Sequence, residues 1–160
     1  MTINDIPNFI QVSEHTALGG QPSEEHFRSA REAGYEVVIN LAPTAATEGS
    51  LLNEPELLDA LGFEYHHIPV AWAAPAIEEF DRFVRVMDGL GNRRALIHCA
   101  ANFRVTAFYA LYAIKQLGWS DEQAETLMDR VWKSRADYSM DDNWKNFIGL
   151  ARQQMGAAAR

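Results

Sequence analysis

Apolar residues along the chain follow two spacings, one that suits strands buried in a sheet and one that suits helices with a single apolar face. Short apolar runs predict strands at 9–12, 17–18, 37–41, 64–70 and 95–97. Helical spacing, capping residues and closing glycines predict helices at 24–33, 56–61, 77–90, from 105 onward, at 121–132 and from 141 or 142 to about 155.

Strands that alternate with helices in this way favour an α/β fold with a mainly parallel sheet covered by helices. A chain of 160 residues with 48% hydrophobic residues is long enough for one sizeable core, whereas two domains would be cramped. We therefore expect a single domain at 1–155, followed by a frayed tail at 156–160.

The net charge and the residues at the N-terminus limit which partners and locations we expect. The formal net charge of −8 argues against duplex nucleic acid and anionic membranes, because both reward clustered Lys and Arg. Residues 1–7 have neither a basic region nor a long apolar stretch, so we expect no signal peptide and a cytoplasmic location.

Cysteine and histidine usage limits the kinds of site. The single cysteine, Cys99, excludes an internal disulfide and a multi-thiolate metal site. The five histidines lack metal-ligand spacing, and the adjacent His66 and His67 would point to opposite faces of a strand. We expect neither a metal nor another cofactor.

One stretch, 95–106, carries the candidate chemistry. It places Cys99 at the end of an apolar strand and Arg104 where a helix should begin. The backbone N–H groups between them would converge at the helix N-terminus, where partial positive charge favours an anion. A thiolate at that point is a reactive nucleophile, and a guanidinium adds donors for oxyanions.

A plainer interpretation fits the same two residues. A lone cysteine at the end of a buried strand is commonly inert core, and an arginine in the first turn of a helix is commonly a surface residue. The order His98, Cys99, turn, Arg104 and helix favours the functional interpretation.

The stretch resembles the phosphate-binding loop of cysteine-dependent protein tyrosine and dual-specificity phosphatases, in which His-Cys is followed by five residues, Arg, and Ser or Thr. Here only four residues separate Cys99 from Arg104. In this respect the chain is more similar to a bacterial branch of phosphatase-like proteins, which occur alone or fused to metallo-hydrolases linked to sulfur metabolism. The segments 19–22, 37–41 and 67–70 also carry the resemblance.

The resemblance implies a phosphatase-like fold with the cysteine loop between a central strand and a helix, and a role for each site residue. Cys99 would be the nucleophile, Arg104 the clamp for phosphate oxygens, His98 a support that fixes the loop, and Thr106 an aid to departure of the thiolate. The anion-binding loop would consist of Ala100, Ala101, Asn102, Phe103 and Arg104. Asn102 stands where the family prefers Gly, and Asn is the next residue most willing to adopt a positive φ.

The short spacing leaves two registers open. If the loop has lost one residue, Arg104 remains the clamp, and a tighter ring of donors fits a guest smaller than a phosphoryl group. If the loop keeps its length, Cys99 to Thr106 is the usual cysteine-to-hydroxyl spacing and Val105 stands at the clamp position. Phosphate binding would then be crippled.

The general acid is the second point at which this sequence departs from the pattern of the family. Family members protonate the leaving oxygen with an aspartate on a loop well before the cysteine, a contribution of typically 10²–10⁴-fold, but the matching segment 71–75 contains no acid. Glu78 and Glu79 follow it, and we expect both in the first turn of a helix. The sequence does not select among the further carboxylates Asp137, Asp141 and Asp142.

Four aromatic residues surround these segments in the sequence. Trp72 would either cap the pocket as its wall or pack on its own scaffold. We assign Trp132, Tyr138 and Trp144 to helix packing.

Three functions remain open at this point. The leading one is a phosphatase-like hydrolase that acts on a phosphate monoester through a thiophosphoryl-enzyme on Cys99, with weak turnover because a clear acid is missing. The second is a rhodanese-like sulfurtransferase that carries a persulfide on Cys99, which would account for both departures. The third is an inactive module that binds phosphorylated or other anionic ligands.

Overall fold

The computed structural model describes residues 2–43, 53–134 and 139–158. Within these ranges one sheet has the strand order β1-β2-β5-β3-β4. Its strands are β1 (Ile10–Gln11), β2 (Thr16–Gly19), β3 (Tyr35–Asn40), β4 (Glu64–His67) and β5 (Arg94–His98). Only β1 and β2 pair antiparallel, and the other neighbours are parallel. The predicted α/β fold with a mainly parallel sheet is confirmed, and β5 is its central strand.

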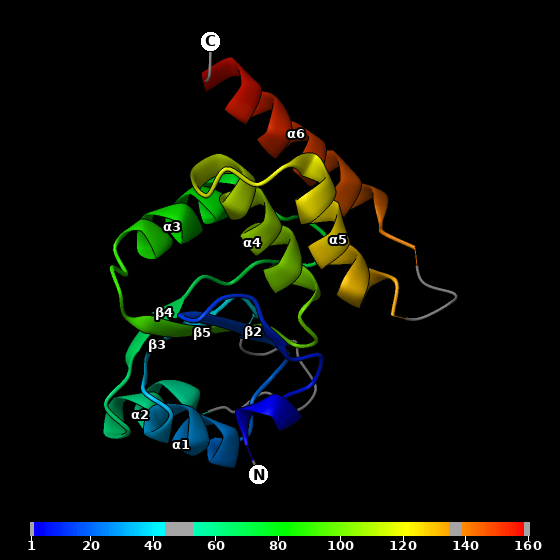
Figure 1. Ribbon diagram of the computed structural model, residues 1–160. Helices are drawn as coiled ribbons and strands as arrows, with labels where there is room; N and C mark the ends of the chain where they lie inside the picture. Colours follow the sequence, from blue (N-terminus) through cyan, green and yellow to red (C-terminus); the bar gives the residue numbers. More distant parts are fainter. Residues whose placement is uncertain (1, 44–52, 135–138, 159–160) are drawn as a thin grey trace.

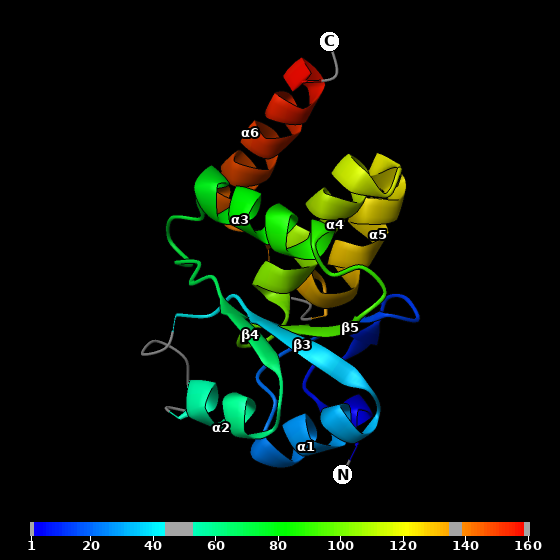
Figure 2. The same cartoon turned by 90° about the vertical axis from the view of Figure 1, so that its left-hand side faces the viewer.

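Helices cover both faces of the sheet, as Figures 1 and 2 show. The helix α1 and the helix α2 lie below the sheet in Figure 1, together with the short 3-10 helix η1 (Ile3–Asp5), and four longer helices lie above it. The helices are α1 (Glu24–Glu32), α2 (Glu54–Ala60), α3 (Ile77–Asp88), α4 (Phe103–Gln116), α5 (Asp121–Trp132) and α6 (Asp142–Ala158).

Several helix boundaries differ from the predicted ones by one to three residues, among them those of α2, α4 and α6. The helix α2 begins at Glu54 rather than 56, with Pro55 in its first turn, where the missing N–H of proline is no loss. The helix α4 begins at Phe103 rather than 105, because Asn102 caps it in a left-handed conformation. The helix α6 continues to Ala158, so the expected tail at 156–160 begins inside a helix, and its last two residues lie outside the described ranges.

The two faces of β5 contribute to two separate hydrophobic cores. Ala95 and Ile97 pack in the core beneath α3 to α6, whereas Leu96 packs in the smaller core that contains residues of α1 and α2. This alternation is the two-residue period of a strand. Cys99 belongs to the first core, so its side chain continues the pattern of Ala95 and Ile97 just beyond the end of the strand.

The helix α4 is the centre of the larger core. Its residues 104–113 are all buried, because α3, α5 and α6 cover the sides that the sheet leaves open. A helix that is apolar on every side is stable only when it is covered in this way. Among the described residues, no helix is both long and apolar enough to span a membrane.

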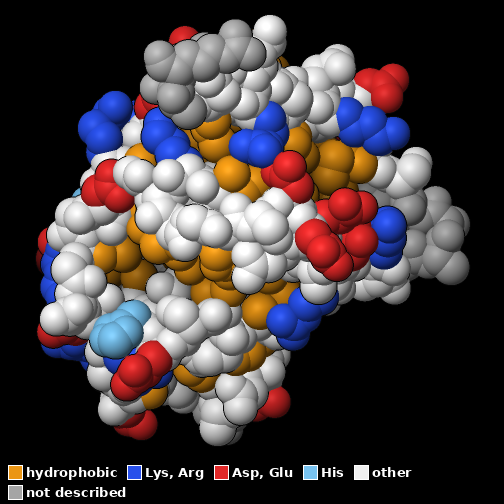
Figure 3. All heavy atoms as spheres, turned by 45° about the horizontal axis from the view of Figure 1, so that its top comes forward, with side chains coloured by type: hydrophobic (Ala, Val, Ile, Leu, Met, Phe, Trp, Pro, Cys, Tyr) orange, Lys and Arg blue, Asp and Glu red, His pale blue; other side chains and the backbone are white. Residues whose placement is uncertain are grey.

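The surface carries charge close to exposed apolar side chains. On the face shown in Figure 3, acidic and basic side chains are interspersed around apolar residues. At the sheet edge, Glu64 of β4 is paired with Arg93 at 3.0 Å and lies 2.9 Å from His66. The opposite edge strand, β1, is only two residues long.

Gly20 lies where the chain leaving β2 passes the loop after β5. A Cβ atom added at Gly20 would lie 2.7 Å from the carbonyl oxygen of Ala100 and 3.1 Å from that of Pro7. Backbone atoms cannot move aside easily, so we expect Gly20→Ala to lower the free energy of unfolding by about 1–3 kcal/mol. Urea unfolding measures this change.

Gly149 provides the matched control for that substitution. It lies in the middle of α6, and a Cβ atom added there meets nothing within 4 Å. Gly149→Ala should raise the free energy of unfolding by up to about 1 kcal/mol, since alanine is the better helix former. A Gly20→Ala protein as stable as the wild type would contradict the close approach of the two segments.

Candidate functional site

The predicted anion-binding loop is the connection between β5 and α4. The strand ends at His98 and the helix begins at Phe103, so that only residues 99–102 lie between them. Asn102 is the N-cap residue with φ 73°, which confirms the positive φ predicted for it. The N–H groups of the first helical turn therefore face the loop, at the positive end of a helix of 14 residues.

The turn after β2 holds this loop from one side. The backbone N–H of Cys99 donates to the carbonyl oxygen of Gly19 at 3.3 Å, and the N–H of Gln21 donates to the carbonyl oxygen of Ala100 at 3.0 Å. Both bonds join segments about eighty residues apart in sequence. They fix the backbone on either side of the candidate nucleophile.

Asn8 holds the loop from the other side. Its side-chain amide donates to the carbonyl oxygen of Ala101 at 2.9 Å, and the amide of Asn102 donates to the carbonyl oxygen of Asn8 at 2.7 Å. This reciprocal pair makes the segment before β1 part of the frame of the site. No local pattern could predict this pair, because the two asparagines are 94 positions apart.

The side chain of Cys99 is fully buried, with 0% of its surface exposed. Val105, which one of the two registers put at the clamp position, is also fully buried in the core. The hydroxyl of Thr106 donates within its own helix, to the carbonyl oxygens of Asn102 at 2.9 Å and Phe103 at 3.1 Å. These contacts engage the hydroxyl that was expected to assist the thiolate.

Arg104 is buried although it lies in the first turn of a helix. Its exposed fraction is 8%, and its guanidinium carbon lies 5.3 Å from the centre of the Trp72 ring. Its Nε atom is buried without a hydrogen-bond partner, and no carboxylate among the described residues forms an ion pair with it. The site thus contains a buried positive charge that an anion would complement.

Trp72 packs on its own scaffold, as one of the two alternatives posed for it expects, and its ring also lies over the guanidinium of Arg104. That Trp72 forms the wall of a pocket at the loop stays a prediction. Its indole N–H donates to the carboxylate of Asp141 at 2.6 Å, and its carbonyl oxygen accepts from the indole of Trp144 at 2.9 Å. Its ring is stacked on that of Trp132, with 5.5 Å between centres. The segment 71–75 is therefore tied to α5 and to the start of α6.

Asp141 is the carboxylate that folding brings to the acid-free segment, through this bond to Trp72. Glu78 and Glu79 lie in the first turn of α3 as expected, and Glu79 accepts from the backbone N–H of Ala76 at 2.9 Å, which caps the helix. Burial raises the pKa of Glu79. Asp142 is the first residue of α6, and the other candidates, Asp137 and the aromatic Tyr138, lie outside the described residues.

His98 is paired with a residue that the sequence analysis did not single out. Its Nε2 atom lies 2.8 Å from the carboxylate of Glu54, a residue with 3% of its surface exposed. Glu54 also accepts from Gln21 at 2.8 Å and from the hydroxyl of Tyr65 at 3.1 Å. The only sequence signal for Glu54 was its place near a helix start, where acidic residues are common.

Burial by itself would raise the pKa of Glu54. The hydrogen bond and charge of His98, together with the hydrogen bonds from Gln21 and Tyr65, outweigh this and hold the pKa below its ordinary value. The network therefore contains a charged carboxylate, and the buried charge is compensated by its donors.

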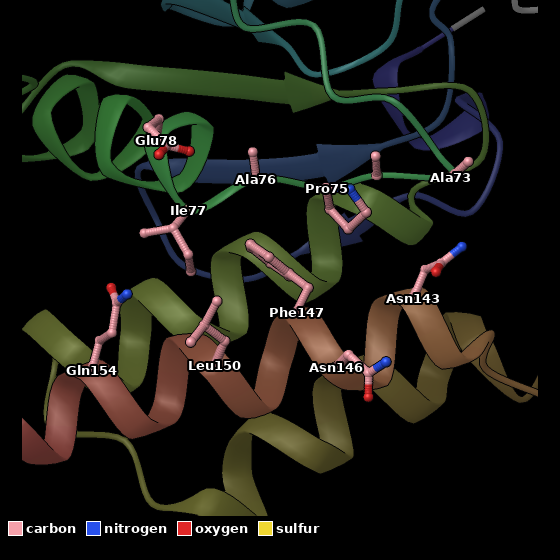
Figure 4. Close-up of a pocket in the computed structure, with 11 residues that line it drawn as sticks. Ala73, Pro75, Ala76, Ile77, Glu78, Asn143, Asn146, Phe147, Leu150 and Gln154 are labelled. Atoms are coloured by element: carbon pink, nitrogen blue, oxygen red, sulfur yellow. The ribbon is translucent and has the colours of Figure 1, made fainter.

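A groove of about 560 Å³ lies between the segment 73–76 and α6, as Figure 4 shows. Phe147 and Leu150 of α6 face Pro75 and Ile77 across it. No residue from 99–104 lines this groove, although the segment that forms one of its walls also carries Trp72. Among the described residues, no group of three His, Cys, Asp or Glu side chains is placed to hold a metal ion.

No protein-family model matches this chain. A solved structure from Shewanella putrefaciens CN-32, described as "Putative phosphatase (DUF442)", has 27% sequence identity and a TM-score of 0.82, and the match covers 96% of each chain. The structure of PTPMT1 in complex with PI(5)P has 16% identity and a TM-score of 0.75, with coverage of 95% of this chain and 99% of that one.

A curated relative from Xylella fastidiosa, the "Beta-lactamase hydrolase-like protein", is 26% identical over 123 residues. These residues are 74% of this chain but 28% of the relative, so the chain spans just over a quarter of that protein's length. The likeness of these two solved structures thus extends over nearly the whole chain.

Glu54→Gln tests the energetic role of the network through its pH dependence. A carboxyl whose pKa is lower in the folded state stabilises the protein above its unfolded value of 4.5, and this contribution is lost as the pH falls through the folded pKa. We expect the variant to be roughly 3 kcal/mol less stable than the wild type at neutral pH, and the difference to shrink in acid.

Urea unfolding at several pH values measures this difference. Glu56→Gln, which changes an exposed carboxylate on the same helix, is the control and should follow the wild type at every pH. A Glu54→Gln protein whose deficit stays constant from neutral to acidic pH would show that Glu54 is not ionised in the folded state.

Proposed function

Since the chain has the fold of the protein tyrosine and dual-specificity phosphatases, we propose that it is a cysteine phosphatase-like hydrolase that cleaves a phosphate monoester at Cys99. The observation that carries this proposal is the guanidinium of Arg104, which is buried with its Nε unpartnered and without an ion pair to a described carboxylate. It lies at the same helix N-terminus as the loop of the only cysteine. An oxyanion would supply the missing partner.

In the proposed reaction, the sulfur of Cys99 attacks phosphorus, so that a P–S bond forms and the P–O bond to the leaving group breaks. Arg104 and the N–H groups at the start of α4 hold the remaining phosphate oxygens. The leaving oxygen takes up a proton as its bond breaks. Water then attacks the thiophosphoryl-enzyme, which releases inorganic phosphate and restores the thiolate.

Asp141 supplies the proton to the leaving oxygen in this proposal. Its carboxylate is bonded to the indole edge of Trp72, and the face of the same indole covers Arg104, so one ring separates the acid from the anion site. The segment 71–75 would thus obtain from the start of α6 the acid that it lacks itself. Trp72 has to move before a substrate can contact both groups.

The ligand of a structural neighbour agrees with this chemistry. PTPMT1 was solved in complex with PI(5)P, which shows that in that protein the fold accepts a phosphate-bearing ligand. For this chain we expect a phosphate or another small oxyanion beside Arg104. The rest of the substrate is left unassigned, since the site carries no further feature that selects it.

Sulfur transfer is a second candidate, favoured by the shortness of the loop. Only residues 99–102 separate β5 from α4, and a tighter ring of donors would suit a guest smaller than a phosphoryl group. The thiolate of Cys99 would attack the outer sulfur of thiosulfate, forming a persulfide while sulfite leaves. Intact mass after incubation with thiosulfate would then show one added sulfur on the protein, and Cys99→Ser would show none.

Hydrolysis of p-nitrophenyl phosphate tests the leading proposal. We expect slow release of nitrophenol by the wild type and a loss of at least about 1,000-fold in Cys99→Ser, because that substitution removes the nucleophile. Arg104→Lys keeps the charge but not the paired donors, and should lose about 100-fold. Equal activity in Cys99→Ser would rule the mechanism out.

A comparison of phosphate binding with turnover distinguishes an enzyme from the inactive anion-binding module. Calorimetry should detect phosphate binding by the wild type and by Cys99→Ser, and its loss in Arg104→Ala. Binding without any turnover on aryl phosphates or thiosulfate would favour the inactive anion-binding module over both enzymes.

Asp141→Asn tests the acid through the leaving group. Phenolate needs protonation far more than nitrophenolate does, so we expect the variant to lose about 100-fold on phenyl phosphate and less than about threefold on p-nitrophenyl phosphate. Asp142→Asn, which changes the next residue along the chain, is the control and should act on both substrates like the wild type. Equal losses on both substrates in Asp141→Asn would show that Asp141 does not donate the proton.

A further inference from the structure

The helix α1 begins with a capping box that has histidine where glutamate or glutamine is usual. The hydroxyl oxygen of Ser23 accepts from the backbone N–H of His26 at 3.2 Å. In return, the backbone N–H of Ser23 donates to the Nδ1 atom of His26 at 3.0 Å. An imidazole nitrogen thus stands in the place of the usual side-chain oxygen.

This contact fixes the protonation state of the ring. A nitrogen that accepts from an N–H carries no proton, so the ring of His26 is neutral with its single proton on Nε2. His26 is buried, with 6% of its surface exposed, and its Nε2 atom has no hydrogen-bond partner among the described residues. Unlike the side chain of glutamine, this acceptor can take up a proton near neutral pH.

Three features oppose a positive charge on this ring. A proton added at Nδ1 would face the N–H of Ser23 across 3.0 Å, and it would lie at the positive end of α1. The third feature is burial, which lowers the pKa of His26 more than the negative charges of Asp5 on η1 and Glu25 on α1 raise it. The positive charge of the amino terminus acts in the same direction as burial. None of the ion pairs among the described residues includes His26.

We propose that His26 is an acid-sensitive element of the fold: uptake of a proton by its ring opens the first turn of α1 and loosens the anion-binding loop. A protonated Nδ1 atom would donate to the Ser23 hydroxyl 3.1 Å away, but it no longer accepts from the backbone N–H of Ser23. Both the cap and the buried position of the ring are therefore suited to the neutral form. The consequence for hydrolysis rests on the proposed function, whereas the opening of α1 does not.

Two short stretches of chain connect the start of α1 with the anion-binding loop. Two positions before Ser23 is Gln21, whose backbone N–H donates to the carbonyl oxygen of Ala100 at 3.0 Å. The 3-10 helix η1 packs on α1 and is followed by Asn8, whose side chain donates to the carbonyl oxygen of Ala101. Since both stretches adjoin the start of α1, opening of its first turn would loosen the loop.

Amide hydrogen exchange in the wild type and in His26→Gln tests the proposal. Glutamine keeps a side-chain acceptor for Ser23 but takes up no proton in the range where histidine titrates. The reporters are the amide of Phe27, which donates to the carbonyl oxygen of Ser23 at 3.1 Å, and the amide of Gln21. Because the pKa of His26 is lowered in the folded state, its stabilising effect is lost as the pH falls below the unfolded value of 6.5. Relative to the variant, opening at both amides should rise about tenfold per pH unit there, the slope of one proton.

His15→Gln is the matched control, since it replaces a histidine in the turn between β1 and β2 and leaves the cap of α1 intact. Its amides should open like those of the wild type at every pH. Equal opening in the wild type and in His26→Gln throughout would overturn the proposal. Opening at Phe27 without opening at Gln21 would overturn the coupling of α1 to the loop.

Nuclear magnetic resonance of the wild type alone gives a second measurement, which needs no variant that folds. At neutral pH the ¹⁵N signals of His26 should be those of a neutral ring with its proton on Nε2. On acidification we expect the ring and the amide of Ser23 to change together, with a midpoint below the unfolded value of 6.5. A ring that takes up its proton while the Ser23 amide stays unchanged would contradict the proposal.

Sulfate binding distinguishes this inference from the proposed function, because sulfate keeps the same charge from neutral to mildly acidic pH. The wild type should lose sulfate affinity relative to His26→Gln below pH 6.5, the unfolded pKa of His26, and bind it equally in mild alkali. A protein that binds no oxyanion and hydrolyses no phosphate would refute the proposed function, while amide exchange would still show the opening of α1. Conversely, Cys99-dependent hydrolysis together with opening that is the same in the wild type and in His26→Gln would keep the proposed function and overturn this inference.

Discussion

The guanidinium of Arg104 is buried without a carboxylate partner among the described residues, and the interpretation of the site depends on this charge. Arg104 cannot reach water freely, and its charge is covered by the ring of Trp72 rather than neutralised. Such a charge is costly unless an anion or aromatic surface offsets it. Arg104 lies in the first turn of α4, at the positive end of the helix and five residues after Cys99 in the chain, an arrangement that is costly without an anion and suitable for binding one.

The two candidate site residues at the end of the central strand β5 lie on opposite faces of the sheet. On one face of β5, Cys99 continues the line of Ala95 and Ile97 and packs in the core beneath α3 to α6. On the other face, His98 reaches the network around Glu54. The two-residue period of a strand thus places the candidate nucleophile and the histidine before it on opposite faces of the sheet.

The sequence predicted those parts of the structure that depend on local pattern. The helix 121–132 begins and ends at the predicted residues, and Asn102 has the predicted positive φ. Both features depend on the types of a few neighbouring residues, such as those of a capping box. The start of α4 was missed by two positions, since Phe103 and Arg104 have no spacing that marks them as helical before Asn102 is known to be the cap.

Contacts between distant segments could not be predicted. Glu54 and His98 are 44 positions apart, and Trp72 and Asp141 are 69 positions apart, so nothing local connects either pair. Glu54 had an ordinary explanation at a helix start, and Asp141 was one of several equivalent carboxylates. Only the packing of α2 and α6 against the sheet and its loops gives these residues a place at the site.

The two edges of the sheet bear on how copies of the protein meet. A long, flat, apolar edge offers unpaired backbone groups to a neighbouring molecule, and natural sheets avoid this with short or charged edge strands. Here β1 contributes two residues at one edge, and β4 carries the charges of Glu64 and its partner Arg93 at the other. A second chain that approached either edge would gain few backbone hydrogen bonds, so these edges disfavour self-association through strand addition.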